Sequence, residues 1–127
     1  MIAIEVTTKQ TVTEERVQDL LCCALEGGSN YWYTIVEKCY PEGQTKESLG
    51  IVYPHLELPF KGGCLVISDG DPGTDNQTLD LAAIKRGLQL LADKYPKHWS
   101  DFMQENEDAD TGDVFLQLAL FGEVIFG

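Results

Sequence analysis

The segment from Glu26 to Trp32 carries the side chains best suited to bind a small molecule. It contains two adjacent glycines, which let the backbone turn or approach a ligand more closely than a Cβ atom permits. Glu26 and Asn30 offer hydrogen-bonding groups, and the rings of Tyr31 and Trp32 can stack on a base or a similar ring. The segment therefore predicts a ligand pocket. The structural alternative is a helix end that leads into a core strand.

The same segment is poorly suited to hold a phosphate. It follows the predicted end of a helix, where the helix dipole is negative, whereas phosphates bind at helix N-termini. A phosphorylated ligand needs a nearby cation. The candidates, from this chain or a second subunit, are Lys38, Lys61, Lys85 and Arg86.

Three other patterns carry little chemistry. The acidic stretch 69–75 resembles a calcium loop, but Thr74 stands where an EF-hand needs Gly and Asp80 stands where it needs Glu. His55 and His98 have no nucleophile at a recognisable spacing. We therefore predict no metal site, no cofactor and no catalytic residue. A small hydrolase is a functional alternative that ranks third, after the two hypotheses given at the end of this subsection, because no nucleophile–base pair supports it.

The binding segment lies between a predicted helix and a predicted strand. Thr11 and Glu14 form a capping box, and Thr13 is an alternative N-cap. Apolar residues then recur on one helical face, at Val17, Leu20, Leu21, Ala24 and Leu25. Gly27 supplies a left-handed helix stop. Residues 31–39 are rich in aromatic and β-branched side chains and predict a strand.

The rest of the chain alternates short predicted elements. Alternation predicts a strand over residues 2–7, and short apolar runs predict strands over 56–58 and 63–68. Helices are expected from Thr78 to Tyr95 and over 97–105, separated by Pro96. The whole chain, residues 1–127, is expected to form one α+β domain. Its small antiparallel sheet should have three to five strands, with three to four helices mostly on one face.

A last helix is predicted with Asp110 as its cap and Asp113 at its third helical position. Residues 114–121 are apolar almost all round, so this helix must be covered on every side. It lies either at the centre of the fold or in a subunit interface, and we expect a homo-oligomer on this ground. The apolar tail 124–126 should also be covered.

Composition and charge limit the partners. The 127 residues include 21 acidic and 9 basic side chains, for a net charge of −12, which argues against direct binding to nucleic acid. No stretch predicts a membrane helix or a signal peptide, so a cytoplasmic location is expected. The four cysteines lack a metal-binding spacing and are expected to be free thiols.

Two segments resemble a family of small bacteriophage and prophage proteins. Ala24-Leu25-Glu26-Gly27-Gly28-Ser29-Asn30-Tyr31-Trp32 is similar to the family's ALEGGxxYW stretch, and residues 110–127 are similar to its C-terminal D-x-x-D-x-x-x-Q-x-x-x-F-G-E-x-x-x-G ending. Gly112 stands where the family has Ala. The resemblance implies a phage accessory protein in the host bacterial cytoplasm, acting against host functions or defences. It also implies a joint ligand site made of Glu26, Asn30, Tyr31, Trp32, Asp113, Gln117 and Glu123.

Two functional hypotheses follow. The first is a non-enzymatic binder of a small, nucleotide-like ligand at this site. The second is an acidic protein–protein inhibitor of a host defence protein, in which residues 101–113 imitate nucleic-acid charge as anti-CRISPR proteins often do.

Overall fold

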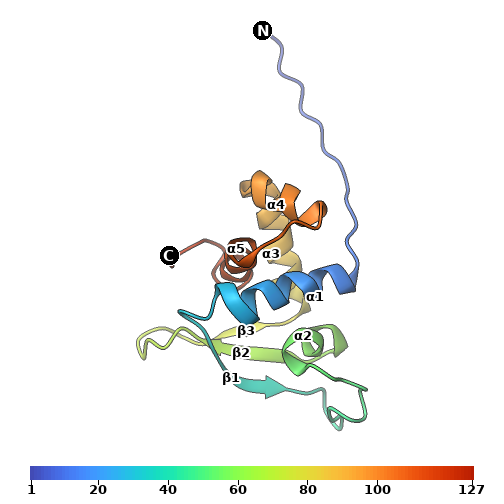
Figure 1. Cartoon of the computed structure of the whole chain (residues 1–127), viewed down its shortest axis with the longest axis vertical. Helices are drawn as coiled ribbons and strands as arrows, with labels where there is room; N and C mark the ends of the chain where they lie inside the picture. Colours follow the sequence, from blue (N-terminus) through green and yellow to red (C-terminus); the bar gives the residue numbers. More distant parts are fainter.

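The computed structural model describes all 127 residues and shows a three-stranded antiparallel sheet with the helices on one face (Figure 1). The α+β prediction is confirmed. The strands are β1 (Thr34–Cys39), β2 (Cys64–Ser68) and β3 (Gln77–Leu79), in that spatial order. The α-helices are α1 (Glu14–Cys23), α2 (Pro54–Glu57), α3 (Leu81–Lys94), α4 (Pro96–Met103) and α5 (Ala109–Phe121). None of them is long and apolar enough to cross a membrane.

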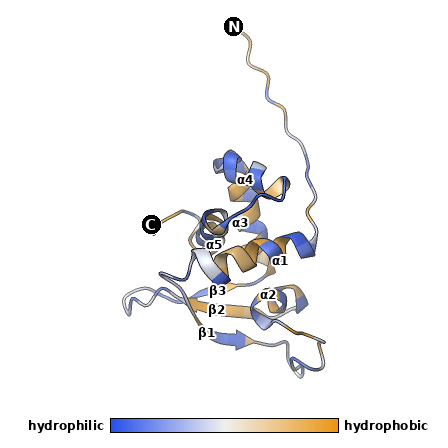
Figure 2. Ribbon diagram, viewed as in Figure 1, coloured by the Kyte–Doolittle hydropathy of each residue, from blue (hydrophilic) through white to orange (hydrophobic).

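The sheet buries one face against the helices. Leu65 and Ile67 of β2 point into the core, and Leu65 pairs with the buried Leu79 of β3. Figure 2 shows β2 as hydrophobic and β1 as a mostly hydrophilic strand at the edge of the sheet. A bulge at Val36 interrupts the pairing of β1 with β2. The core therefore lies between β2, β3 and the helical layer.

Helix α1 begins where its cap predicts and ends differently from the prediction. Thr13, rather than Thr11, is the N-cap, and its hydroxyl accepts the Arg16 N–H at 3.3 Å. At its C-terminal end the chain widens into one π-helical turn, Ala24–Gly28. The predicted left-handed stop at Gly27 is wrong, because the backbone of Gly27 remains right-handed and continues this wider turn.

Helix α5 occupies the centre of the molecule. Residues 115–120 are buried, and α5 packs against α1, α3 and the π-helical turn. The other layers of the same chain therefore cover the all-apolar helix, so it needs no subunit interface. Its cap is Asp108, whose carboxylate accepts the Thr111 N–H at 2.9 Å, and the prediction of Asp110 as cap is wrong.

Glycines set how closely α5 approaches its neighbours. A Cβ atom on Gly87 of α3 would lie 2.7 Å from the Cβ of Ala119, and one on Gly112 would lie 2.5 Å from the backbone nitrogen of Ala24. Both separations are well inside van der Waals contact, so only glycine permits this packing.

Three further predictions differ from the structure. Residues 2–7 are extended but pair with no strand, because no neighbouring strand of the chain lies beside them. Residues 54–61 form α2 and a 3₁₀ turn rather than a strand, since Pro54 and Pro59 each occupy a first-turn position that suits proline. The cap of α3 is Asp80 rather than Thr78, which lies in the short strand β3 that we did not expect.

The contact between α3 and α5 generates a stability prediction. Gly87→Ala should lower the free energy of unfolding by about 1 to 3 kcal/mol, because the added methyl group overpacks against Ala119. Urea unfolding followed by circular dichroism measures the loss. Gly27→Ala is the matched control: nothing lies within 4 Å of its added Cβ atom, so its effect should stay small. Equal losses in the two variants would contradict this account.

Candidate functional site

The carboxylate of Asp113 joins the two segments that stand out in the sequence. One oxygen, Oδ1, accepts the Ser29 hydroxyl at 2.8 Å and the Trp32 indole N–H at 2.7 Å. The other, Oδ2, accepts the Tyr31 hydroxyl at 2.6 Å. Hydrogen bonds to a charged acceptor are among the strongest in proteins. Asp113 therefore ties the first turns of α5 to the residues that follow the π-helical turn.

The π-helical turn makes this arrangement possible. Its wider loop carries residues 29–32 across the N-terminal end of α5, and Gly28 lies directly against that end. A Cβ atom on Gly28 would lie only 2.0 Å from the carbonyl oxygen of Ala109. Gly28 is therefore required for close approach, and the side chains that follow it can reach Asp113.

The C-terminal tail packs on the other side of Trp32. The buried amide oxygen of Gln117 accepts the backbone N–H groups of Ile125 and Phe126, each at 2.8 Å. This folds Phe126 back onto the indole of Trp32, with ring centroids 5.0 Å apart and planes 20° from parallel. Trp32 and Gln117 therefore have architectural tasks, since they hold the tail against the helices.

A pocket of about 380 Å³ opens between these segments. Its walls are Gly28, Tyr31, His98, Asp110, Asp113, Val114, Val124, Phe126 and Gly127. Two carboxylates and an imidazole form the polar part of the wall, and aromatic and aliphatic side chains form the rest. No lysine or arginine lines it. The pocket therefore suits a ligand that donates hydrogen bonds or carries positive charge, and it disfavours phosphate.

The orientation of His98 follows from its neighbours. Thr111 donates its single hydroxyl hydrogen to Asp108 at 3.1 Å, so the Nδ1–H of His98 must be the donor in the 2.9 Å contact with Thr111. The hydrogen bonds from the backbone N–H and the hydroxyl of Thr111 lower the pKa of Asp108, which favours the charged form of this acceptor. The other ring nitrogen of His98, Nε2, has no hydrogen-bond partner within the chain.

The predicted site residues separate into three groups. Tyr31 and Asp113 line the pocket, whereas Trp32 and Gln117 lie buried behind it. The remaining three, Glu26, Asn30 and Glu123, are exposed and form none of its walls. Their predicted role in ligand binding therefore has no support from the pocket geometry.

Glu26 makes a different contact. Its carboxylate lies 2.8 Å from Nε2 of His55 in α2, and this hydrogen bond, together with one from Cys22, lowers the pKa of Glu26. The pKa of the Cys22 thiol changes in the opposite direction. Desolvation and the neighbouring Glu26 raise it to about 11. A thiol with a raised pKa is a poor nucleophile. This corner of the molecule connects the π-helical turn to α2.

Sequence reasoning missed Ser29, His98 and Asp110. Asp110 and Asp113 are three residues apart on one helix, and this spacing places both carboxylates on the same face. That signal was available in the sequence. The contribution of His98 was not, because only the packing of α4 against α5 brings it to the pocket.

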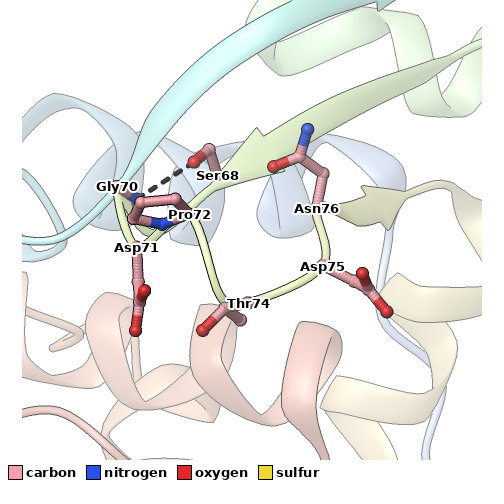
Figure 3. Close-up of a pocket in the computed structure, with 7 residues that line it drawn as sticks. All are labelled: Ser68, Gly70, Asp71, Pro72, Thr74, Asp75 and Asn76. Carbon is pink, nitrogen blue, oxygen red and sulfur yellow. Dashed lines mark hydrogen bonds between the residues drawn. The ribbon is translucent and has the colours of Figure 1, made fainter.

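The acidic loop between β2 and β3 forms a separate open hollow of about 380 Å³ (Figure 3). Asp69 and Asp71 accept backbone N–H groups of the loop at 2.9 and 2.8 Å, which stabilises the turn. Figure 3 shows Asp71 and Asp75 on opposite sides of the loop, so their carboxylates do not converge. No group of three or more His, Cys, Asp or Glu side chains in the chain is arranged to hold a metal ion.

Comparison with protein-family models, with curated proteins and with solved structures finds no match for this chain. The site is therefore interpreted from its own geometry.

The three hydrogen bonds to Asp113 predict a large stability effect. Asp113→Asn removes the charge and turns one acceptor into a donor, which leaves part of the Ser29, Tyr31 and Trp32 set without a partner. The free energy of unfolding should fall by about 2 to 3 kcal/mol in urea denaturation. Asp110→Asn is the matched control, since the Asp110 carboxylate forms no hydrogen bond within the chain and its effect should stay small. A loss no larger than that of the control would contradict the role of Asp113.

The same contact predicts the titration of Tyr31. Desolvation and the hydrogen bond to Asp113 raise the pKa of Tyr31 to about 12, because both favour the neutral phenol over the phenolate. Asp113→Asn removes the negative charge, so the pKa of Tyr31 should fall toward its ordinary value of about 10. Carbon-13 NMR of labelled tyrosine rings measures this, with Tyr31→Phe identifying the resonance. An unchanged pKa in Asp113→Asn would show that Asp113 does not act on the phenol.

Proposed function

We propose that this chain is a phage-encoded accessory or counter-defence protein that binds a small molecule bearing a protonated amine, without converting it chemically. One observation carries the proposal: the pocket beside Tyr31 places two carboxylates, Asp110 and Asp113, next to aromatic rings, with no basic side chain in its wall. An ammonium group gains both a counter-charge and a cation–π contact from such a wall.

This geometry narrows the ligand class expected from the sequence. A nucleotide-like ligand needs a cation for its phosphate, and none of the candidate basic side chains lines the pocket. Arg86 instead donates to the carbonyl oxygen of Ala119 at 2.7 Å, within the contact between α3 and α5. A base-like or aromatic ring remains compatible with Tyr31 and Phe126, provided that it carries an amine rather than a phosphate.

The orientation of Thr111 supports binding over catalysis. A hydroxyl nucleophile is activated when it donates its hydrogen to a base such as histidine. Thr111 donates to Asp108 and accepts from His98, which is the opposite arrangement. The hydrolase alternative therefore has no activated nucleophile at this pocket.

The acidic-inhibitor alternative receives less support from the geometry. Of the six acidic residues in the stretch 101–113, five are engaged within the chain. Asp101 lies 3.6 Å from Lys97, Glu105 and Glu107 lie near Arg16, Asp108 caps α5, and Asp113 binds Ser29, Tyr31 and Trp32. A surface that imitates nucleic acid needs carboxylates that are free to meet a basic partner. Asp110 is the exception, and it lines the pocket.

The biological setting rests on the phage-family resemblance. We infer that the protein acts in the cytoplasm of the host bacterium, where it would sequester an amine-bearing molecule used by the host, and that it works as a homo-oligomer. All nine residues that line the pocket belong to one chain, so ligand binding at this pocket does not depend on the homo-oligomer.

Isothermal titration with tyramine, agmatine and spermidine tests the proposal, with adenosine monophosphate as the phosphate-bearing comparison. At least one amine should bind, and at about 100 times its Kd it should add roughly 2.7 kcal/mol to stability, which raises Tm. Asp110→Asn should weaken binding roughly tenfold without unfolding the protein, since it removes one charged contact. Asp101→Asn, at a partly exposed acid outside the pocket, is the matched control.

Two outcomes would contradict the proposal. The first is tighter binding of adenosine monophosphate than of every amine. The second is equal binding by wild type and Asp110→Asn, which would place the ligand elsewhere.

A further inference from the structure

The first twelve residues form an arm that leaves the body of the molecule (Figure 1). Ile2, Ile4 and Val6 are 87%, 83% and 78% exposed, although they are large apolar side chains. They alternate with Ala3, Glu5 and Thr7 in the period of a strand. The arm therefore has the sequence of a β-strand and, within one chain, no strand to pair with.

The root of the arm is fixed and directs the rest away from the sheet. The indole N–H of Trp99 in α4 donates to the side-chain oxygen of Gln10 at 2.6 Å, and Val12 packs against the core. Beyond this anchor the arm runs past α4, whereas β1 lies at the opposite end of the molecule (Figure 1). The arm is thus aimed away from its own sheet.

Strand β1 presents the complementary feature. It pairs only with β2, so the N–H and C=O groups of its outer edge have no strand partner. Its six residues are enough to pair with part of the segment 2–7. An exposed sheet edge is a ready template for a strand from another chain.

Opposite charges on Glu5 of the arm and Lys38 of β1 favour one register for pairing these two segments. In an antiparallel pair that sets Glu5 opposite Lys38, Ile4 lies opposite Cys39 and Val6 lies opposite Glu37. Residues directly opposite each other point to the same face of a sheet. Since Cys39 pairs with Cys64 and Glu37 pairs with Val66, Ile4 and Val6 would extend the half-buried row that Cys64 and Val66 form on the face away from the core.

We propose that the segment 2–7 of one chain pairs antiparallel with β1 of a second copy, with residues 4–7 opposite residues 39–36, and that the second copy returns its own arm in the same way. The exchange gives a closed two-fold dimer, because the same two chains donate an arm to each other. It gives the open edge of β1 in each copy a strand partner and places Ile4 and Val6 beside the half-buried Cys64 and Val66. The exchange specifies the homo-oligomer of the proposed function, and because no residue of the ligand pocket takes part in it, its failure is distinguishable from a failure of ligand binding.

Light scattering coupled to size-exclusion chromatography tests the exchange on the full chain. At about 100 μM the mass should be twice the 14.1 kDa of one chain. A variant that lacks residues 2–7 should be monomeric and keep its helical signal, since Ile2, Ile4 and Val6 are largely exposed and only Val6 and Thr7 border a hollow beside α3. A monomeric full chain, for example one whose arm folds onto its own α3, would overturn the proposal. A dimer that survives the deletion would overturn it as well.

A charge exchange tests the register separately. Glu5→Lys alone and Lys38→Glu alone should each weaken the dimer by roughly tenfold, because each places like charges opposite one another at two symmetric sites. The double variant, with both substitutions in one chain, should restore wild-type affinity. Lys9→Glu, outside the paired segment, is the matched control and should leave affinity unchanged. A double variant weaker than either single variant would overturn the proposed pairing.

Discussion

The carboxylate of Asp113 is the contact on which the functional end of this protein depends. It accepts hydrogen bonds from Ser29, Tyr31 and Trp32, about eighty residues away in the chain. Trp32 in turn stacks on Phe126, and the buried Gln117 holds the tail that carries Phe126. The π-helical turn, the start of α5 and the C-terminal tail therefore form one connected unit, and the pocket is the space that they leave between them.

Neighbouring residues of this connected unit have different roles. Some pack the segments together, and others line the pocket that we propose binds a ligand. Trp32 and Gln117 are buried and serve packing, whereas Tyr31 stays 59% exposed and faces the pocket while it bonds to Asp113. Because the polar wall contains carboxylates and no cation, its chemistry favours amines over phosphates. The strand pairing proposed for the N-terminal arm uses none of the residues that line the pocket.

Periodicity predicts the parts of the fold that depend on local pattern. Helices α1 and α3, strand β2 and the α+β class follow from apolar spacing. The pairing of residues 29–32 with Asp113 does not, because hydrogen bonds between distant segments leave no periodic trace. The strand predicted over residues 56–58 is wrong, because Pro54 and Pro59 start two helical segments that outweigh the short apolar alternation. Residues 2–7 have the alternating pattern of a strand, but no strand of the same chain pairs with them.

Hydrogen exchange of the two tryptophan indoles tests the central role of Asp113 most directly. The indole N–H of Trp32 is donated to Asp113 within a 7% exposed side chain, whereas that of Trp99 is donated to Gln10 on the exposed arm. In nitrogen-15 NMR, the account predicts that the Trp32 indole exchanges much more slowly than the Trp99 indole, and that Asp113→Asn removes most of this difference. Equal exchange rates in the wild-type protein would contradict it.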